Sequence, residues 1–131
     1  MPDTKLADSS LLFSQALAAL RKTPQDRLAF AGASKCFEVA FEYAWKWFKR
    51  QADDAGLEAY GPRDSIKAAA QLGFIQDLQR WERFLHARNL SVHDYLGISD
   101  KDFKEAMSDF ERALAELRKT HLEAGSNGQK K

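Results

Sequence analysis

The feature that most constrains the fold of this chain is residues 26–54, where apolar side chains recur at helical spacing around much of a helix's circumference. One apolar stripe consists of Phe37, Phe41, Ala44 and Phe48, and the stripe beside it consists of Ala40, Tyr43 and Trp47, with Trp45 widening the surface. A helix that is apolar on so many sides needs more than one neighbour. The segment therefore predicts a central helix, covered within a bundle or across a dimer.

The other long segments also have the period of an α-helix, and none alternates apolar and polar residues as a strand does. Expected helices cover about residues 10–21, 26–54, 62–72, 77–89 and 99–122. Pro62 and Gly73 bracket the short third helix, and Ser99 with Asp102 resembles a capping box at the start of the last. Because the loops are short, the pattern predicts an all-α fold, an antiparallel up-and-down four-helix bundle with an extra short helix.

The 131 residues fit one domain. We expect the bundle to span residues 10–122, between a frayed N-terminus at residues 1–9 and a disordered tail at residues 123–131, because both ends are small and polar. There is no apolar signal core and no apolar run of membrane-spanning length. These features predict a cytoplasmic protein without membrane association.

Composition excludes several kinds of site. The net charge of +1 gives no overall attraction to nucleic acid, so such binding would need a local patch. The single cysteine, Cys36, excludes an internal disulfide, and no Cys/His cluster has zinc spacing. Neither a glycine-rich phosphate loop nor the paired aspartates of a nucleotidyltransferase is present. We therefore predict no metal and no cofactor.

The strongest candidate for a functional residue is Arg88. It extends the apolar stripe of Trp81, Phe84 and Leu85 by one helical turn. A guanidinium on a face directed at the core is costly unless a negative or hydrogen-bonding group meets it. Either an internal carboxylate, from Glu38 or Glu42, or the phosphate of a ligand satisfies that requirement.

His93 follows Arg88 by five residues, and two local geometries are open. In an unbroken helix the two side chains differ by about 140° and flank one groove. Alternatively, Ser91 caps a new turn and places His93 near a helix N-terminus, where an anion is favoured. In both, a cation and an imidazole suited to proton transfer surround one polar spot. Tyr95 stands two residues further on, either as a half-buried aromatic or as a hydroxyl beside this pair.

The motifs together resemble one family. They are Phe37-Glu38, the run from Phe41 to Lys46, Gly61-Pro62-Arg63-Asp64, Gly73-Phe74-Ile75, Trp81, Arg88-Asn89 and His93-Asp94-Tyr95. In their order and spacing they resemble the HEPN superfamily, in its nucleotidyltransferase substrate-binding-protein-like, or HepT-like, branch. The resemblance extends over about residues 10–120, nearly the whole chain.

The resemblance implies a homodimer whose Arg and His motifs face each other in a cleft, and a minimal nucleotidyltransferase as partner. Many HEPN proteins are metal-independent endoribonucleases that act as toxins. By this resemblance Arg88 and His93 are catalytic, Asn89 is the polar neighbour of the arginine, and Tyr95 is the hydroxyl to which the partner adds a nucleotide, silencing the toxin.

Two other functions remain open. The first is that of a non-catalytic subunit that binds substrate for the nucleotidyltransferase. The second is that of a purely structural bundle in which Arg88 pairs with Glu38 or Glu42. The complete Arg88, His93 and Tyr95 set favours the ribonuclease, since a scaffold does not require all three.

Overall fold

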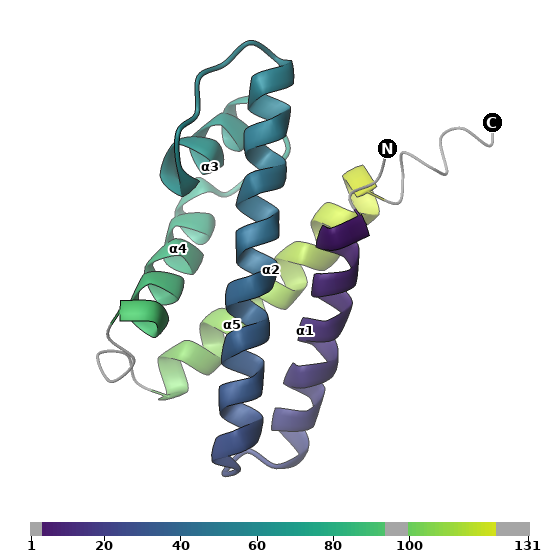
Figure 1. Ribbon diagram of the computed structural model, residues 1–131, viewed down its shortest axis with the longest axis vertical. Helices are drawn as coiled ribbons and strands as arrows, with labels where there is room; N and C mark the ends of the chain where they lie inside the picture. The colour runs from purple at the N-terminus through teal and green to yellow at the C-terminus, as the bar shows by residue number, and fades with distance from the viewer. Residues whose placement is uncertain (1–3, 94–99, 123–131) are drawn as a thin grey trace, which may run out of the picture.

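The computed structural model describes residues 4–93 and 100–122. Within those ranges the regular secondary structure is helical, and there is no β-strand. The elements are α1 (Thr4–Lys22), α2 (Arg27–Asp54), α3 (Pro62–Gln71), α4 (Leu78–His93), α5 (Asp100–Leu117) and the π-helical turn η2 (Arg118–Leu122). The four long helices alternate in direction, α3 lies in the connection between α2 and α4, and α5 crosses behind α2 at an angle (Figure 1). The predicted all-α bundle with one extra short helix is confirmed.

Local chemistry sets the ends of α2 and α3 where the sequence predicted them. The Asp26 carboxylate caps α2 by accepting hydrogen bonds from the backbone N–H groups of Leu28, at 2.9 Å, and Ala29. Gly56, just beyond the end of α2, has a φ of 78°, a left-handed conformation that favours glycine. Pro62 begins α3, and Gly73 follows it with a φ of 85°.

Helix α1 begins at Thr4, so residues 4–9 are helical and the expectation of a frayed segment there was wrong. Leu6 is fully buried, seven residues before Phe13 on the same face. Two of the small polar residues near the start of the helix form hydrogen bonds with its backbone. The hydroxyl groups of Ser9 and Ser10 both donate to the carbonyl oxygen of Leu6. Small polar residues are thus accommodated within a helix whose apolar face is buried.

In the C-terminal half of the chain, the bounds of helices α4 and α5 differ from those expected. Helix α4 continues to His93 and not only to about Asn89, while α5 begins at Asp100 and gives way to the π-helical turn before Leu122. Ser99, the expected first residue of a capping box, lies outside the described residues. No helix in the described part of the chain is long and apolar enough to cross a membrane.

An aromatic cluster at the crossing of α5 with the other long helices forms the centre of the core. The Phe110 ring on α5 lies 5.1–5.9 Å, between ring centroids, from five others: Phe13, Phe37, Phe41, Trp81 and Phe84. These five come from α1, α2 and α4. Helix α2 is therefore covered by several neighbours of its own chain, as its broad apolar surface predicted.

Candidate functional site

Arg88 of α4 points toward α2 and is held there by three contacts. Its Nη2 lies 2.8 Å from Oε2 of Glu42, and its Nη1 donates to Oδ1 of Asn89 at 2.8 Å. The guanidinium carbon lies 5.9 Å from the ring centroid of Phe41, within the range of a cation–π contact. Only 19% of the Arg88 side chain is exposed. Of the alternatives left open by the sequence, an internal carboxylate is the observed partner, and it is Glu42.

Glu42 is ionised in this arrangement. Partial burial alone would raise its pKa, but the hydrogen bond from Arg88, a contribution from the Trp45 indole and the charges of Arg88 and Lys46 outweigh it, so the pKa of Glu42 lies below its ordinary value. Lys46 Nζ lies 4.0 Å from Glu42 Oε1. The carboxylate therefore neutralises Arg88 at neutral pH and fixes the direction of the guanidinium.

Glu38, the other predicted acidic residue, contacts Ser91 and not Arg88. The buried Ser91 hydroxyl lies 3.3 Å from Glu38 Oε2 and 3.0 Å from the Arg88 carbonyl oxygen. Ser91 lies within an unbroken α4, so the alternative in which it caps a new turn was wrong. Five side chains thus form what we call the α2–α4 polar cluster: Glu38, Glu42, Arg88, Asn89 and Ser91.

His93 is the last residue of α4, and its side chain lies outside the described part of the structure, as does Tyr95. Because α4 is continuous, His93 lies about 7.5 Å along the helix axis from Arg88 and about 140° around it. The helix therefore brings Arg88 and Asn89 to the α2–α4 polar cluster and places the backbone of His93 just beyond it. The roles of His93 and Tyr95 stay predictions.

Arg80, which was not predicted from the sequence, fixes α4 against α5. Its guanidinium binds Asp109, with Nη2 to Oδ1 at 2.9 Å, and Glu116, with Nη1 to Oε1 at 3.0 Å. The side chain is largely buried, and the two carboxylates hold its pKa above the ordinary value of arginine. The available signal was the seven-residue spacing of Asp109 and Glu116, which puts both on one face of α5. Arg80 thereby helps to orient the helix that carries Arg88.

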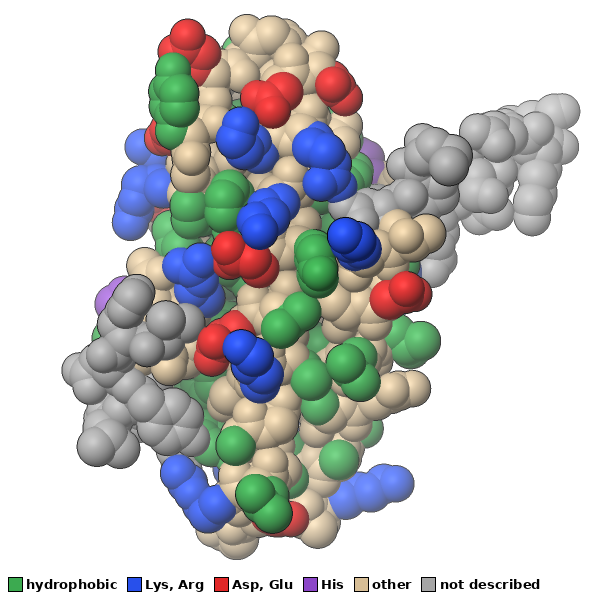
Figure 2. Space-filling model, viewed as in Figure 1, with side chains coloured by type: hydrophobic (Ala, Val, Ile, Leu, Met, Phe, Trp, Pro, Cys, Tyr) green, Lys and Arg blue, Asp and Glu red, His purple; other side chains and the backbone are tan. Residues whose placement is uncertain are grey.

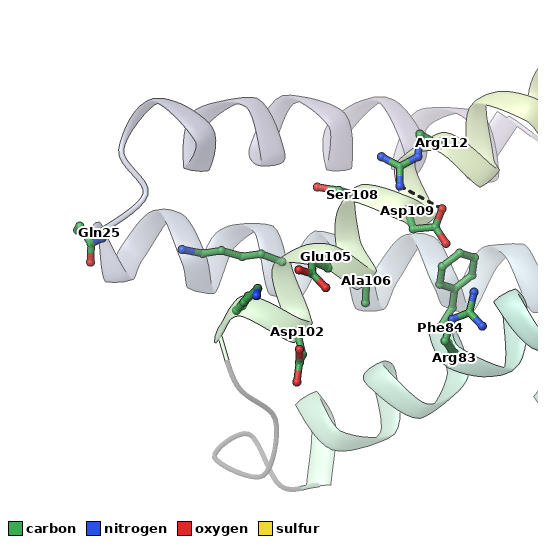
Figure 3. A pocket seen from close by; sticks show the side chains of 11 residues that line it. Gln25, Arg83, Phe84, Asp102, Glu105, Ala106, Ser108, Asp109 and Arg112 are labelled. Carbon is green, nitrogen blue, oxygen red and sulfur yellow. Dashed lines mark hydrogen bonds and ion pairs between the residues drawn. The ribbon is translucent and has the colours of Figure 1, made fainter.

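A groove of mixed charge runs between α4 and α5 (Figure 3). It is lined by Gln25, Arg83, Phe84, Lys101, Asp102, Lys104, Glu105, Ala106, Ser108, Asp109 and Arg112, none of which belongs to the α2–α4 polar cluster. Arg112 and Asp109, three residues apart on α5, pair at 3.3 Å along one side of it. Acidic and basic side chains are also intermixed along the face seen in Figure 2. Neither surface is a broad basic patch of the kind that binds nucleic acid without a specific site.

The described residues contain no group of three or more His, Cys, Asp or Glu side chains that could hold a metal ion. The polar chemistry of the α2–α4 cluster consists of one arginine, two carboxylates, an amide and a hydroxyl. Such a set can bind an anionic group through the arginine and orient it by hydrogen bonds. Proton transfer near neutral pH requires a further group, and His93 stays the predicted one.

Comparison with known proteins gives the family. A sequence profile described as "Nucleotidyltransferase substrate binding protein like" matches residues 4–119. The chain belongs to this family. The HepT-like resemblance inferred from the sequence is therefore confirmed, and it extends over nearly all of the described helices.

Two relatives add to this assignment. The chain is 37% identical over 78 residues to a Haemophilus influenzae protein named probable ribonuclease HepT. That match covers 54% of this chain and 51% of the other, so the chain spans about half the length of this curated relative. A crystal structure of a protein from Thermus thermophilus has a similar fold, with a TM-score of 0.63 and 23% sequence identity over 80% of this chain and 94% of that one.

Proposed function

We propose that this protein is a HEPN-type endoribonuclease and the toxin of a two-component system in which a minimal nucleotidyltransferase is the antitoxin. One observation carries the proposal: a charged, oriented Arg88 lies on the same unbroken helix as His93, five residues earlier. The 37% identity with a protein named as a probable ribonuclease supports it. The net charge of +1 and the charges intermixed on the face seen in Figure 2 favour a small local cleft over general RNA binding.

The chemistry needs no group beyond arginine and histidine. A histidine removes the proton from a ribose 2′-hydroxyl, whose oxygen attacks the adjacent phosphorus. The bond from phosphorus to the 5′-oxygen breaks, and a protonated histidine supplies a proton to that oxygen. The products are a 2′,3′-cyclic phosphate and a 5′-hydroxyl. Arg88 stabilises the negative charge that develops on the phosphorane oxygens.

A homodimer supplies these groups in duplicate. Two chains whose α4 helices meet at a twofold axis bring two copies each of Arg88 and His93 to one cleft. One imidazole then acts as base while the other acts as acid. In this assembly Asn89 orients Arg88. Glu38 of α2 contacts the Ser91 hydroxyl and so supports the helix that carries Arg88.

The first test is cleavage of RNA by the purified protein in excess EDTA. We expect cleavage to continue, because arginine and histidine supply both the charge and the proton transfer, and we expect the fragments to end in a 2′,3′-cyclic phosphate. End-group analysis by mass spectrometry distinguishes these ends from 3′-hydroxyl ends. Intact RNA after incubation with the dimeric protein, or loss of cleavage in EDTA, would contradict the proposal.

Tyr95 is proposed as the residue through which the partner silences the toxin. Its hydroxyl oxygen attacks the α-phosphorus of ATP, the hydroxyl proton is lost, and pyrophosphate leaves. Incubation with the nucleotidyltransferase and ATP is expected to raise the intact mass by one nucleotidyl group, and Tyr95→Phe to abolish the increase. The added phosphate would occupy the cleft beside Arg88.

Tyr60→Phe is a matched control for this mass measurement, because the Tyr60 side chain is 76% exposed and lies in the connection between α2 and α3. We expect it to be modified as fully as the wild type. Modification that persists in Tyr95→Phe and disappears in Tyr60→Phe would transfer the acceptor role to Tyr60.

The second candidate function is a non-catalytic subunit that binds substrate for the nucleotidyltransferase. The family's own description favours it, and so does the pairing of Arg88 with Glu42, since a neutralised arginine also fits a structural or binding role. Under this function the protein stimulates nucleotide transfer by its partner onto a third molecule. RNA then stays intact with the wild-type protein alone.

A further inference from the structure

The indole N–H of Trp45 is a buried donor without an acceptor. Trp45 lies on α2, and its Nε1 atom is shielded from solvent and makes no hydrogen bond within residues 4–93 and 100–122. Buried donors are nearly always paired, because leaving one unpaired costs the free energy of its lost hydration. A donor left unpaired in one state of a protein is a candidate for a role in another.

The acceptor available to Trp45 is the carboxylate of Glu42. The two residues are three positions apart on α2 and so are neighbours on its surface. A weak interaction with the indole N–H helps to lower the pKa of Glu42, but Nε1 does not have the geometry of a hydrogen bond, and Oε2 of that carboxylate is bound to Arg88 at 2.8 Å. Glu42 thus stands between two donors and forms a full hydrogen bond with only one of them.

We propose that Glu42 has two positions, one on Arg88 when the site is empty and one on the Trp45 indole N–H when Arg88 binds a phosphate group. Trp45 is then a positioning residue, which receives the carboxylate that the arginine releases. The inference rests on the proposed function only for the identity of the anion, an RNA phosphate.

The energetics favour such an exchange. An anion that takes Arg88 from Glu42 leaves a partly buried carboxylate unpaired, and that cost opposes binding. A hydrogen bond from an N–H already unpaired in the empty state offsets the cost, because neither group then remains unsatisfied. Lys46, whose Nζ is 4.0 Å from Oε1, also attracts this carboxylate, but its side chain is half-exposed and can be hydrated instead. The indole N–H of Trp45 is shielded from solvent, so it gains more from the hydrogen bond.

The exchange can be tested without RNA, by replacing Arg88. Arg88→Met removes the guanidinium and keeps an unbranched aliphatic side chain over Phe41. The three tryptophans give three indole N–H signals in a proton–nitrogen correlation spectrum, and Trp45→Phe identifies that of Trp45. We expect Arg88→Met to move the Trp45 signal downfield, as formation of a hydrogen bond does, and the other two signals to stay in place.

Two further variants isolate the role of Glu42. In the double variant Arg88→Met with Glu42→Leu no carboxylate remains, so the Trp45 signal is expected to return toward its wild-type position. Lys46→Ala, which removes the other cation near Glu42, is the matched control and is expected to leave the signal unchanged. An unmoved Trp45 signal in Arg88→Met, or a downfield shift that persists in the double variant, would overturn the exchange.

This outcome is separable from that of the proposed function. A downfield Trp45 signal in Arg88→Met together with a wild-type protein that leaves RNA intact would retain the exchange and reject the ribonuclease. An unmoved signal together with metal-independent RNA cleavage would reject the exchange alone.

Discussion

Replacing His93 with alanine is expected to lower the rate of RNA cleavage by about 10²–10⁴-fold, the contribution typical of general acid–base catalysis. The reason is that His93 is the proposed proton donor and acceptor of the site, and an imidazole is the side chain suited to proton transfer near neutral pH. The measurement is single-turnover cleavage of an RNA oligonucleotide, with wild-type protein and variant compared at equal concentration. Induced expression, followed by growth and RNA integrity, gives the same comparison in cells.

His86→Ala is the matched control for His93. His86 lies on the same helix, seven residues earlier, and its side chain is exposed. Its removal is expected to leave the cleavage rate within about twofold of the wild type, in keeping with the small effects of most surface substitutions. Equal activity of His93→Ala and wild type would exclude proton transfer by His93 and leave the substrate-binding function as the stronger candidate.

A cleft shared by two chains predicts both a dimer and a characteristic dependence of RNA cleavage on pH. Two imidazoles acting as acid and base give a bell-shaped dependence of kcat/KM on pH, whose limbs belong to the pair and not to one histidine. Light scattering on the purified protein is expected to give the mass of a dimer. A monomer that still cleaves RNA would show that one Arg88 and one His93 are sufficient.

The sequence predicted the fold well because the determining signals are local. Helical periodicity, the cap at Asp26, Pro62 at the start of α3 and the glycines at 56 and 73 depend on neighbouring residues only. The early start of α1 was missed because serines usually mark irregular backbone, whereas here their hydroxyls are satisfied by the carbonyl of Leu6.

The site was predictable only as a set of alternatives. Glu38 and Glu42 are four residues apart on one face of α2, so both could meet Arg88 from the sequence alone. The choice of Glu42 depends on how far α2 is shifted along α4, which packing of the whole core determines. The Arg80 ion pairs escaped prediction for the same reason, since they join residues 29 and 36 positions apart.

The same dependence on packing leads to the largest expected change in stability, that of Phe110→Ala. Phe110 is fully buried, and its ring contacts aromatic rings from α1, α2 and α4. Truncation is expected to lower the free energy of unfolding by about 3–5 kcal/mol, the usual cost of a phenylalanine cavity. Because domains of this size are stable by about 5–15 kcal/mol, the variant would lose much of its margin. Urea unfolding followed by circular dichroism measures the change.

Leu11→Ala is the control, since that side chain is 58% exposed on α1, and a change of less than about 0.5 kcal/mol is expected. A cost below about 1.5 kcal/mol for Phe110→Ala would mean that the surrounding rings collapse into the cavity. Such a collapse would move Trp81 and Phe84, the residues that seat α4 against the core, and with them the register of Arg88 against Glu42. The aromatic cluster around Phe110 therefore helps to position the α2–α4 polar cluster. A loss of RNA cleavage in a Phe110→Ala variant that is still folded would be the functional sign of that coupling.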